Sequence, residues 1–273
     1  MESEAKKPEL VDGTHQLAIE MNSQRQMALS NPRDVKVVLA KVLAELTMAP
    51  EFAEESYYAI TYGSGEKETV VEGLSVKASR AIGRLWGNCA IGSRIVLEDD
   101  EVAEAEGVFV DIETNTFFRR PVRIAKTYVP RGSSIPVPLK GVHLTNAIQA
   151  GLSKAERNAT LSGLPEWFKE RVFAAAKQIA GSKDKGVKTD AERLDACYAA
   201  FGKFGVEPAR VLAYVQAKLK GKPTDEVIGT MLGVYNSIRD KQVTADEVFV
   251  KAEAKKDAGA VKLADIMKDE APQ

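Results

Sequence analysis

The sequence predicts an α+β fold: a core of β-strands flanked by long helices, followed by a small all-helical domain. Segments rich in aromatic and β-branched residues fall between 57 and 128, and segments with a helical spacing of apolar residues lie on both sides. A polar, glycine-bearing stretch, 181–189, then separates the long helices from several short ones. With 273 residues, 44% of them apolar, the chain can bury one large core or two small ones.

Five segments follow from this pattern. Residues 1–24 are polar and without clear periodicity, so we expect a mobile N-terminal arm there. The core, the linker, the small helical domain and a loosely ordered tail then occupy 25–180, 181–189, 190–250 and 251–273.

Proline marks both ends of the first core helix. Asn31 is a capping residue, Pro32 suits the first helical position, and the helix ends before Pro50. After a short helix at 51–56, the next six elements are predicted in the order β-β-α-β-β-β. They are a strand at 57–62, a strand at 69–71, a helix at 73–86, and strands at 89–97, 102–113 and 116–128.

Only helices are expected beyond the last of these strands. Two long ones belong to the core and are separated by a break at 163–165. The predicted ranges are 141–162 and 166–180 in the core, then 190–201, 207–219, 224–239 and 245–249 in the small domain.

The charge of the chain changes sign near Phe117. From Met1 to Thr116 there are eleven Lys/Arg and twenty-one Asp/Glu, a net charge of −10, whereas residues 117–177 have eleven and three, a net charge of +8. The overall charge of −1 therefore conceals a basic region suited to a polyanion.

The strand Thr116–Lys126 opens this basic region. Alternation puts Phe117, Arg119 and Arg123 on one face, and Pro121 indicates an edge or bulged strand. The opposite face also has apolar members: Phe118, Val122 and Ile124. Arg119 and Arg123 would lie roughly 13 Å apart and could hold separate phosphates of an extended strand. The alternative is an ordinary solvated sheet face paired with the acidic strand before it.

Two helices add further cations. Lys77, Arg80 and Arg84 follow the spacing i, i+3, i+7 and share one face of the helix 73–86. Lys154 and Arg157 have the spacing i, i+3 on the helix 141–162.

Several function classes lack their signatures. The chain has no phosphate-binding Gly-x-x-x-x-Gly-Lys-Ser/Thr loop, and His15 and His143 lie in no metal-spaced cluster. Cys89 and Cys197 fit a reducing cytosol better than a disulfide framework. No apolar run approaches the roughly 18–20 residues of a membrane span, and the first residues have no signal-peptide pattern.

One acidic motif suggests an enzyme. Asp111 and Glu113 form an Asp-x-Glu on a strand, which resembles the first metal-binding motif of proofreading-type exonucleases. Such sites need more acids, and between Thr114 and Lys183 the only carboxylates are Glu156, Glu166 and Glu170. A solvated hairpin end is the alternative explanation.

The segments 72–88 and 145–158, with the strand pair between them, resemble the core of phage single-strand annealing proteins. The sequences are Glu-Gly-Leu-Ser-Val-Lys-Ala-Ser-Arg-Ala-Ile-Gly-Arg-Leu-Trp-Gly-Asn and Thr-Asn-Ala-Ile-Gln-Ala-Gly-Leu-Ser-Lys-Ala-Glu-Arg-Asn. The resemblance covers about residues 30 to 180 and includes the RecT, Red beta and Erf families. Gln149 and Ala150 stand where a related protein can carry more cations.

The resemblance implies a non-enzymatic, ATP-independent DNA-recombination and repair protein without a cofactor. Such a protein binds single-stranded DNA, anneals it to a second strand, and assembles into a homo-oligomeric ring or helical filament in the cytoplasm of a bacterial host. Its DNA lies in a groove between a hairpin and a basic helix. By position, Lys154 and Arg157 match the basic helix, and Arg119, Arg120 and Arg123 match the hairpin side. The remaining candidate DNA-binding residues come from the charge pattern: Lys77, Arg80, Arg84 and Lys126.

Four aromatic residues are candidates for base stacking, with core packing as the alternative role. They are Trp86, Phe117, Phe118 and Trp167. We expect the core to bind DNA without the small domain, which would recruit a partner exonuclease or the host single-stranded DNA-binding protein, or else complete the fold. Two rival functions remain, a metal-dependent nuclease using Asp111 and Glu113, and a protein-interaction scaffold.

Overall fold

The computed structural model has a mixed α+β fold, as the sequence predicts, and it describes residues 14–62, 69–130, 134–184, 186–240 and 242–249. The first half of the chain contains α1 (Thr14–Ser30), α2 (Val35–Met48), α3 (Pro50–Glu55), β1 (Tyr57–Tyr62), β2 (Thr69–Leu74), α4 (Val76–Trp86), β3 (Cys89–Glu98), β4 (Val102–Asp111) and β5 (Thr116–Ala125). The second half contains β6 (Thr127–Tyr128), β7 (Val137–Pro138), α5 (Val142–Ser162), α6 (Glu166–Ser182), α7 (Asp190–Ala200), the 3₁₀ helix η2 (Phe201–Phe204), α8 (Pro208–Lys218), α9 (Thr224–Arg239) and α10 (Ala245–Val248).

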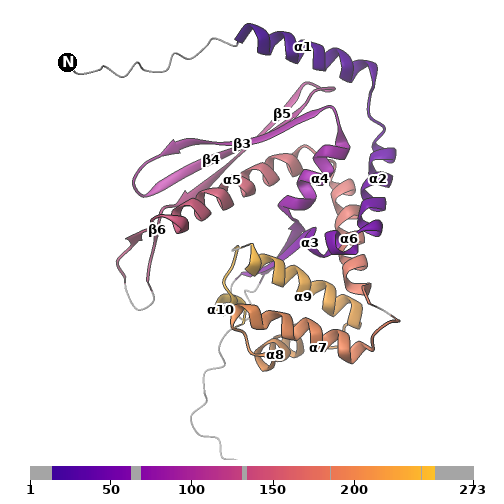
Figure 1. Ribbon diagram of the computed structural model, residues 1–273, viewed down its shortest axis with the longest axis vertical. Coiled ribbons are helices and arrows are strands. Elements are labelled where there is room, and N and C mark those ends of the chain that lie inside the picture. Colours follow the sequence, from indigo (N-terminus) through magenta and orange to yellow (C-terminus); the bar gives the residue numbers. More distant parts are fainter. Residues whose placement is uncertain (1–13, 63–68, 131–133, 185, 241, 250–273) are drawn as a thin grey trace, which may run out of the picture.

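The described strands form three separate antiparallel sheets. They are β1–β2, the larger sheet β3–β4–β5, and the small pair β6–β7. Figure 1 shows α5 running along one face of the larger sheet. That face is apolar, because Ala103, Ala105 and Ile124 are buried there with Ala155 of α5. The predicted alternation of β5 is confirmed, and β5 lies at an edge of the sheet, as Pro121 indicates.

Close contact between α5 and the sheet depends on Gly107 in the middle of β4. A Cβ atom at this position would lie 1.9 Å from the backbone oxygen of Ala155, so any side chain would push the helix away. The short distance fixes α5, and with it Lys154 and Arg157, against the strands.

Helices α2, α4 and α6 form the main core beside the end of this sheet (Figure 1). Trp86 at the end of α4 packs edge-to-face on Phe168 of α6, with ring centroids 5.4 Å apart. Phe109 from β4 joins the same cluster, so the sheet and the helices share one core.

The C-terminal helical unit, which we define as α7 to α10, is fused to the core by α9. The Ser237 hydroxyl donates to the Ala59 oxygen and accepts from the Ala59 N–H, so it satisfies the free edge of β1. Asn236 donates to the Tyr57 oxygen, and the buried Tyr57 hydroxyl donates to the Gly229 oxygen at 2.6 Å. Ala59 itself belongs to the apolar cluster of the C-terminal unit.

Only the start of the predicted linker is packed, because residues 184 and 186–189 are exposed. Helix α6 continues to Ser182, two residues beyond its predicted end at 180, and a Cβ on Gly181 would lie 2.2 Å from the Asp225 oxygen of α9. Arg193 is buried, donates to the oxygens of Gly181 and Lys183, and pairs with Asp225. Gly181 therefore permits close packing of α6 and α9, whereas Gly186 lies in an exposed turn with a φ of +83°.

Several other boundaries differ from the prediction. Helix α2 begins at Val35 with Asp34, not Asn31, as its cap. The predicted strand 116–128 is divided into β5 and β6, and β6 pairs with β7 in a stretch where no strand was expected. Helix α1 begins at Thr14, inside the predicted arm, and Figure 1 shows it standing apart from the other helices. Strand β2 continues through Gly73, so α4 begins only at Val76, where the Ser75 hydroxyl caps the helix. Residues 1–13 and the predicted tail 251–273 lie outside the described residues.

Candidate nucleic-acid interface

An open groove with a volume of about 580 Å³ lies between α5, the edge of β5 and the β1–β2 sheet. Residues 122–124 of β5 form one wall, and Tyr58, Ile60 and Val71 form the other. Helix α5 lies along it with residues between Ala147 and Arg157, and Asp240 and Gln242 from the end of α9 complete the lining.

Arg157 is the most unusual residue of this groove. Only 7% of it is exposed, and its guanidinium stacks 4.6 Å from the centre of the Tyr58 ring. Its hydrogen bonds go to the neutral Asn158 side chain at 3.1 and 3.3 Å. Within the described ranges it has no carboxylate partner, although burying a charge is costly unless it is paired. The groove therefore has a largely buried positive charge available for an anion.

Three more of the predicted cations line the same groove. Lys154 and Arg123 are exposed and have no ion pair with any other described residue, whereas Lys77 pairs with Glu55 at 2.6 Å. The structure thus brings together four of the nine predicted DNA-binding residues, from α4, β5 and α5.

The other five predicted cations do not line the groove. Arg119 lies on the uncovered face of the larger sheet, opposite Val108 of β4. Arg123 shares that face by alternation but lines the groove at the edge of β5. The other four are already bonded: Arg80 to Glu156 at 2.6 Å, Arg84 to Glu45 at 2.8 Å, Lys126 to Glu98 at 2.9 Å, and Arg120 to the Ser162 hydroxyl at 2.9 Å.

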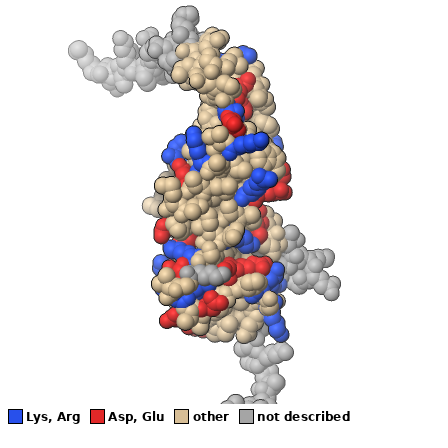
Figure 2. Space-filling model, turned by 90° about the vertical axis from the view of Figure 1, so that its right-hand side faces the viewer, with Lys and Arg blue, Asp and Glu red and all other residues tan. Residues whose placement is uncertain are grey.

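Acids therefore neutralise the predicted basic stripe of α4. All three of its cations have a carboxylate within 2.8 Å. Figure 2 shows the same mixing on the side of the molecule that carries α2 and α6, where blue and red side chains are interspersed. Spacing in the sequence identified one helix face but contained no information on the acids of neighbouring helices.

None of the four predicted stacking residues lines the groove. Trp86 and Phe118 pack in the core, which was the alternative role, and Trp167 lies at the surface with Arg171 at 5.6 Å. Phe117 is 52% exposed on the outer face of the sheet. The aromatic residue of the groove is Tyr58, which sequence reasoning missed. The alternation of β1 could have indicated it, because Tyr57 is buried and Tyr58, the next residue, must then point to the opposite face.

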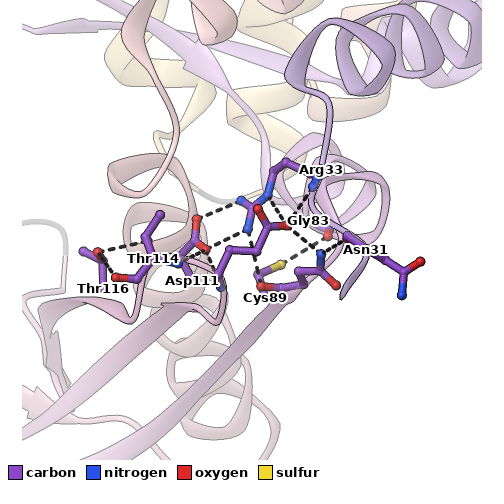
Figure 3. Close-up of polar contacts among 9 residues, drawn as sticks. Asn31, Arg33, Gly83, Cys89, Asp111, Thr114 and Thr116 are labelled. Atoms are coloured by element: carbon purple, nitrogen blue, oxygen red, sulfur yellow. Dashed lines mark hydrogen bonds and ion pairs between the residues drawn. The ribbon is translucent and has the colours of Figure 1, made fainter. Parts of the chain in front are cut away.

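The Asp-x-Glu motif belongs to a different site, the Arg33 cluster, in which hydrogen bonds join Arg33, Asn88, Asp111 and Glu113. Figure 3 labels Arg33 and Asp111 of this cluster. The Arg33 guanidinium donates to both oxygens of Asp111, at 2.7 and 2.8 Å, and to Glu113 at 3.1 Å. The Glu113 carboxylate also accepts from Asn88 and from the Arg33 backbone. Both carboxylates are thus engaged by a cation of the chain, and no group of three potential metal ligands occurs in the described ranges.

The titration behaviour of this cluster fits a structural ion pair. Burial alone would raise the pKa of Glu113, but hydrogen bonds from Asn88 and Arg33 outweigh it and hold the pKa below its usual value. Burial likewise raises the pKa of Cys89 to about 11 and of Cys197 to about 12, so both thiols stay protonated at neutral pH.

No protein-family model, curated protein or solved structure matches this chain. None of the helices in the described ranges combines the length and the apolar character that a membrane span requires.

Proposed function

We propose that the protein binds single-stranded DNA along the groove and anneals it to a complementary strand without ATP. The observation that carries this proposal is the buried Arg157, a cation without a carboxylate partner among the described residues, on the wall of an open groove with Lys154 and Arg123. Phosphate satisfies such a guanidinium through charge-assisted hydrogen bonds.

The groove also supports one strand as the ligand. Its volume of about 580 Å³ is that of a small-ligand site, enough for a short segment of one flexible strand. Tyr58 offers an aromatic face, and stacking on such a face contributes about 1–3 kcal/mol per base with little sequence preference. One groove holds few nucleotides, so binding along a strand requires neighbouring copies, and we include a homo-oligomeric ring or filament in the proposal.

The arrangement of elements supports the resemblance to annealing proteins. We include in the proposal that β1, β2, α4, β3, β4 and β5, which precede the long α5 in the chain, form the annealing core that the resemblance implies. A groove between a hairpin edge and a basic helix is also what that resemblance implies. Recruitment of an exonuclease or a single-stranded DNA-binding protein by the C-terminal unit remains part of the proposal.

The rival functions have less support. A nuclease built on Asp111 and Glu113 would have to displace Arg33, which binds both carboxylates. The second rival is a scaffold that binds an acidic protein. Measuring the affinity for oligonucleotides distinguishes this scaffold from a DNA-binding protein.

The test compares two arginines of the same strand, Arg123, which lines the groove, and Arg119, which does not. Annealing of two complementary fluorescent oligonucleotides is measured without ATP, for the wild type and for Arg123→Glu and Arg119→Glu. The wild type is expected to accelerate annealing, and the Arg123 variant to bind single strands more than tenfold more weakly with a shallower salt dependence. The Arg119 variant has the same change of charge outside the groove and should stay within about threefold of the wild type. No acceleration by the wild type over a broad titration at low salt would refute the function.

A further inference from the structure

We infer that Glu55 and Asp240 act as a built-in electrostatic brake on the groove: Glu55 competes with DNA phosphates for Lys77, Asp240 repels the phosphates, and both keep binding reversible. The inference rests on the proposed function and concerns the strength of binding in the same groove. It also gives the C-terminal helical unit a role at the groove, since Asp240 follows α9 directly.

The position of Asp240 is fixed by the contact between α9 and β1. Asn236 and Ser237, in the last turn of α9, bond to the backbone of Tyr57 and Ala59. The next residue along β1, between those two, is Tyr58, whose ring lies under Arg157. One strand therefore connects the end of α9 to the buried cation of the groove.

An alternating chain of four charges runs from the groove wall to Asp240. The Lys77 ammonium lies 2.6 Å from one oxygen of Glu55, and Arg239 donates to the other oxygen at 3.0 Å. Arg239 then pairs with Asp240 at 2.8 Å. The two ends of this chain, Lys77 and Asp240, both line the groove.

The exposure of these groups makes the pairs exchangeable. The side chains of Lys77 and Glu55 are 48% and 40% exposed, and exposed ion pairs of this kind are weak. A phosphate that enters the groove can therefore take Lys77 from Glu55. Binding must then overcome both the lost pair and the repulsion from the carboxylates, which act within a screening length of about 8 Å.

Such a brake suits a protein that has to test pairing between strands. A groove with four uncompensated cations would hold the first strand tightly and slow its realignment. Lys77, Glu55, Arg239 and Asp240 together add no net charge, so the surplus positive charge comes from Arg123, Lys154 and Arg157.

The experiment compares Glu55→Gln with Glu45→Gln. Both variants lose one negative charge that pairs with an α4 cation, Lys77 or Arg84, but only Lys77 lines the groove. Affinity for a fluorescein-labelled oligothymidylate is measured by anisotropy over a range of salt concentrations, and release by dilution into unlabelled strand. Glu55→Gln is expected to bind about fivefold more tightly, with a steeper salt dependence and slower release. Glu45→Gln should stay within about twofold of the wild type, as a surface charge outside the groove.

A double-mutant cycle identifies the competitor. The gain from Glu55→Gln should largely disappear when Lys77→Gln is also present, because the carboxylate acts through that ammonium. Equal tightening by Glu55→Gln and Glu45→Gln overturns the inference and leaves the proposed function intact. Weaker binding by Glu55→Gln also overturns it, since Glu55 would then position Lys77 for DNA. Absence of oligothymidylate binding by the wild type overturns the proposed function together with the inference.

Discussion

Two arginines of this protein both stack on an aromatic ring and are equally shielded from solvent, but only one of them is paired with carboxylates. Arg33 lies 4.8 Å from the centre of the Trp86 ring, and Arg157 lies 4.6 Å from that of Tyr58. The Arg33 side chain and the Arg157 residue are each only 7% exposed. Arg33 binds two carboxylates, however, whereas Arg157 binds an amide.

This difference separates a structural clamp from a binding site. A buried cation that is fully paired with carboxylates is already compensated and does not need an anionic ligand. The paired carboxylates, in turn, are not available to bind a metal ion. A buried cation bonded only to neutral groups pays the cost of desolvation until an anion arrives. The clamp joins the segment before α2 to the end of β4, while Arg157 faces a groove open to solvent.

The two sites also differ in which parts of the chain build them. The Arg33 cluster is made entirely by residues 33–113, whereas the groove takes Asp240 and Gln242 from beyond the predicted linker. Deleting residues 181–273 tests this difference and has the largest expected effect. It removes α9 from β1 and α6, uncovers the Tyr57 hydroxyl and frees the backbone of Ala59.

We expect the fragment 1–180 to lose at least tenfold in affinity for single-stranded DNA and to unfold with lower cooperativity than the full chain. Oligonucleotide binding and urea unfolding followed by circular dichroism provide the measurements. This expectation reverses the one from the sequence, in which the core alone binds DNA. Wild-type affinity of a cooperatively folded fragment would restore the original division into domains.

Replacing Arg33 by alanine is the next largest change. Asp111 would remain buried and Glu113 half-buried without their cation, and breaking a buried pair typically costs about 3–5 kcal/mol. Chemical denaturation should show that loss in the free energy of unfolding. Arg84→Ala is the control. Its ion pair with Glu45 is exposed to solvent, so the free energy of unfolding should fall by less than about 1 kcal/mol. A small effect of Arg33→Ala would mean that the clamp is not structural.

Periodicity was sufficient to predict most elements, because each depends on residues close in sequence. The alternation in 116–125 and the helical spacing in α5 were read correctly, and Pro121 marked an edge strand. The end of α6 was misjudged because Gly181 allows a close approach of α9, a contact between distant segments.

The site was predicted only in part, for a related reason. Charge counting found Arg123, Lys154 and Arg157, but no local pattern shows that Arg80 meets Glu156, seventy-six residues away. For the acidic pair the sequence offered a solvated hairpin end or a metal site, and neither reading includes Arg33, which lies seventy-eight residues before Asp111. Local patterns identify charged groups, and tertiary contacts decide which of them are already neutralised.

Arg157→Gln tests the other half of the comparison. Loss of this cation should weaken single-stranded DNA binding more than tenfold, about 1.4 kcal/mol, since it removes a desolvated phosphate contact. The free energy of unfolding should change by less than about 1 kcal/mol, because relief of desolvation offsets the lost stacking on Tyr58. Arg80→Gln, one helix away and paired with Glu156, should bind normally. Strong destabilisation without loss of binding would make Arg157 a second clamp.

Glu113→Gln has the smallest expected effect and a distinctive pH dependence. The pKa of Glu113 is lowered in the folded protein, so its ionised form contributes stability above the ordinary pKa of a glutamate, about 4.3, and that contribution is lost as the pH falls through the lower folded value. The variant keeps an oxygen that accepts hydrogen bonds but has no charge, and we expect it to be about 1 kcal/mol less stable than the wild type at pH 7. The difference between the two proteins should shrink below pH 4 and vanish once Glu113 is protonated in both states. Urea denaturation at several pH values measures this, and a difference that stays constant from pH 7 to pH 3 would show that the charge of Glu113 does not stabilise the clamp.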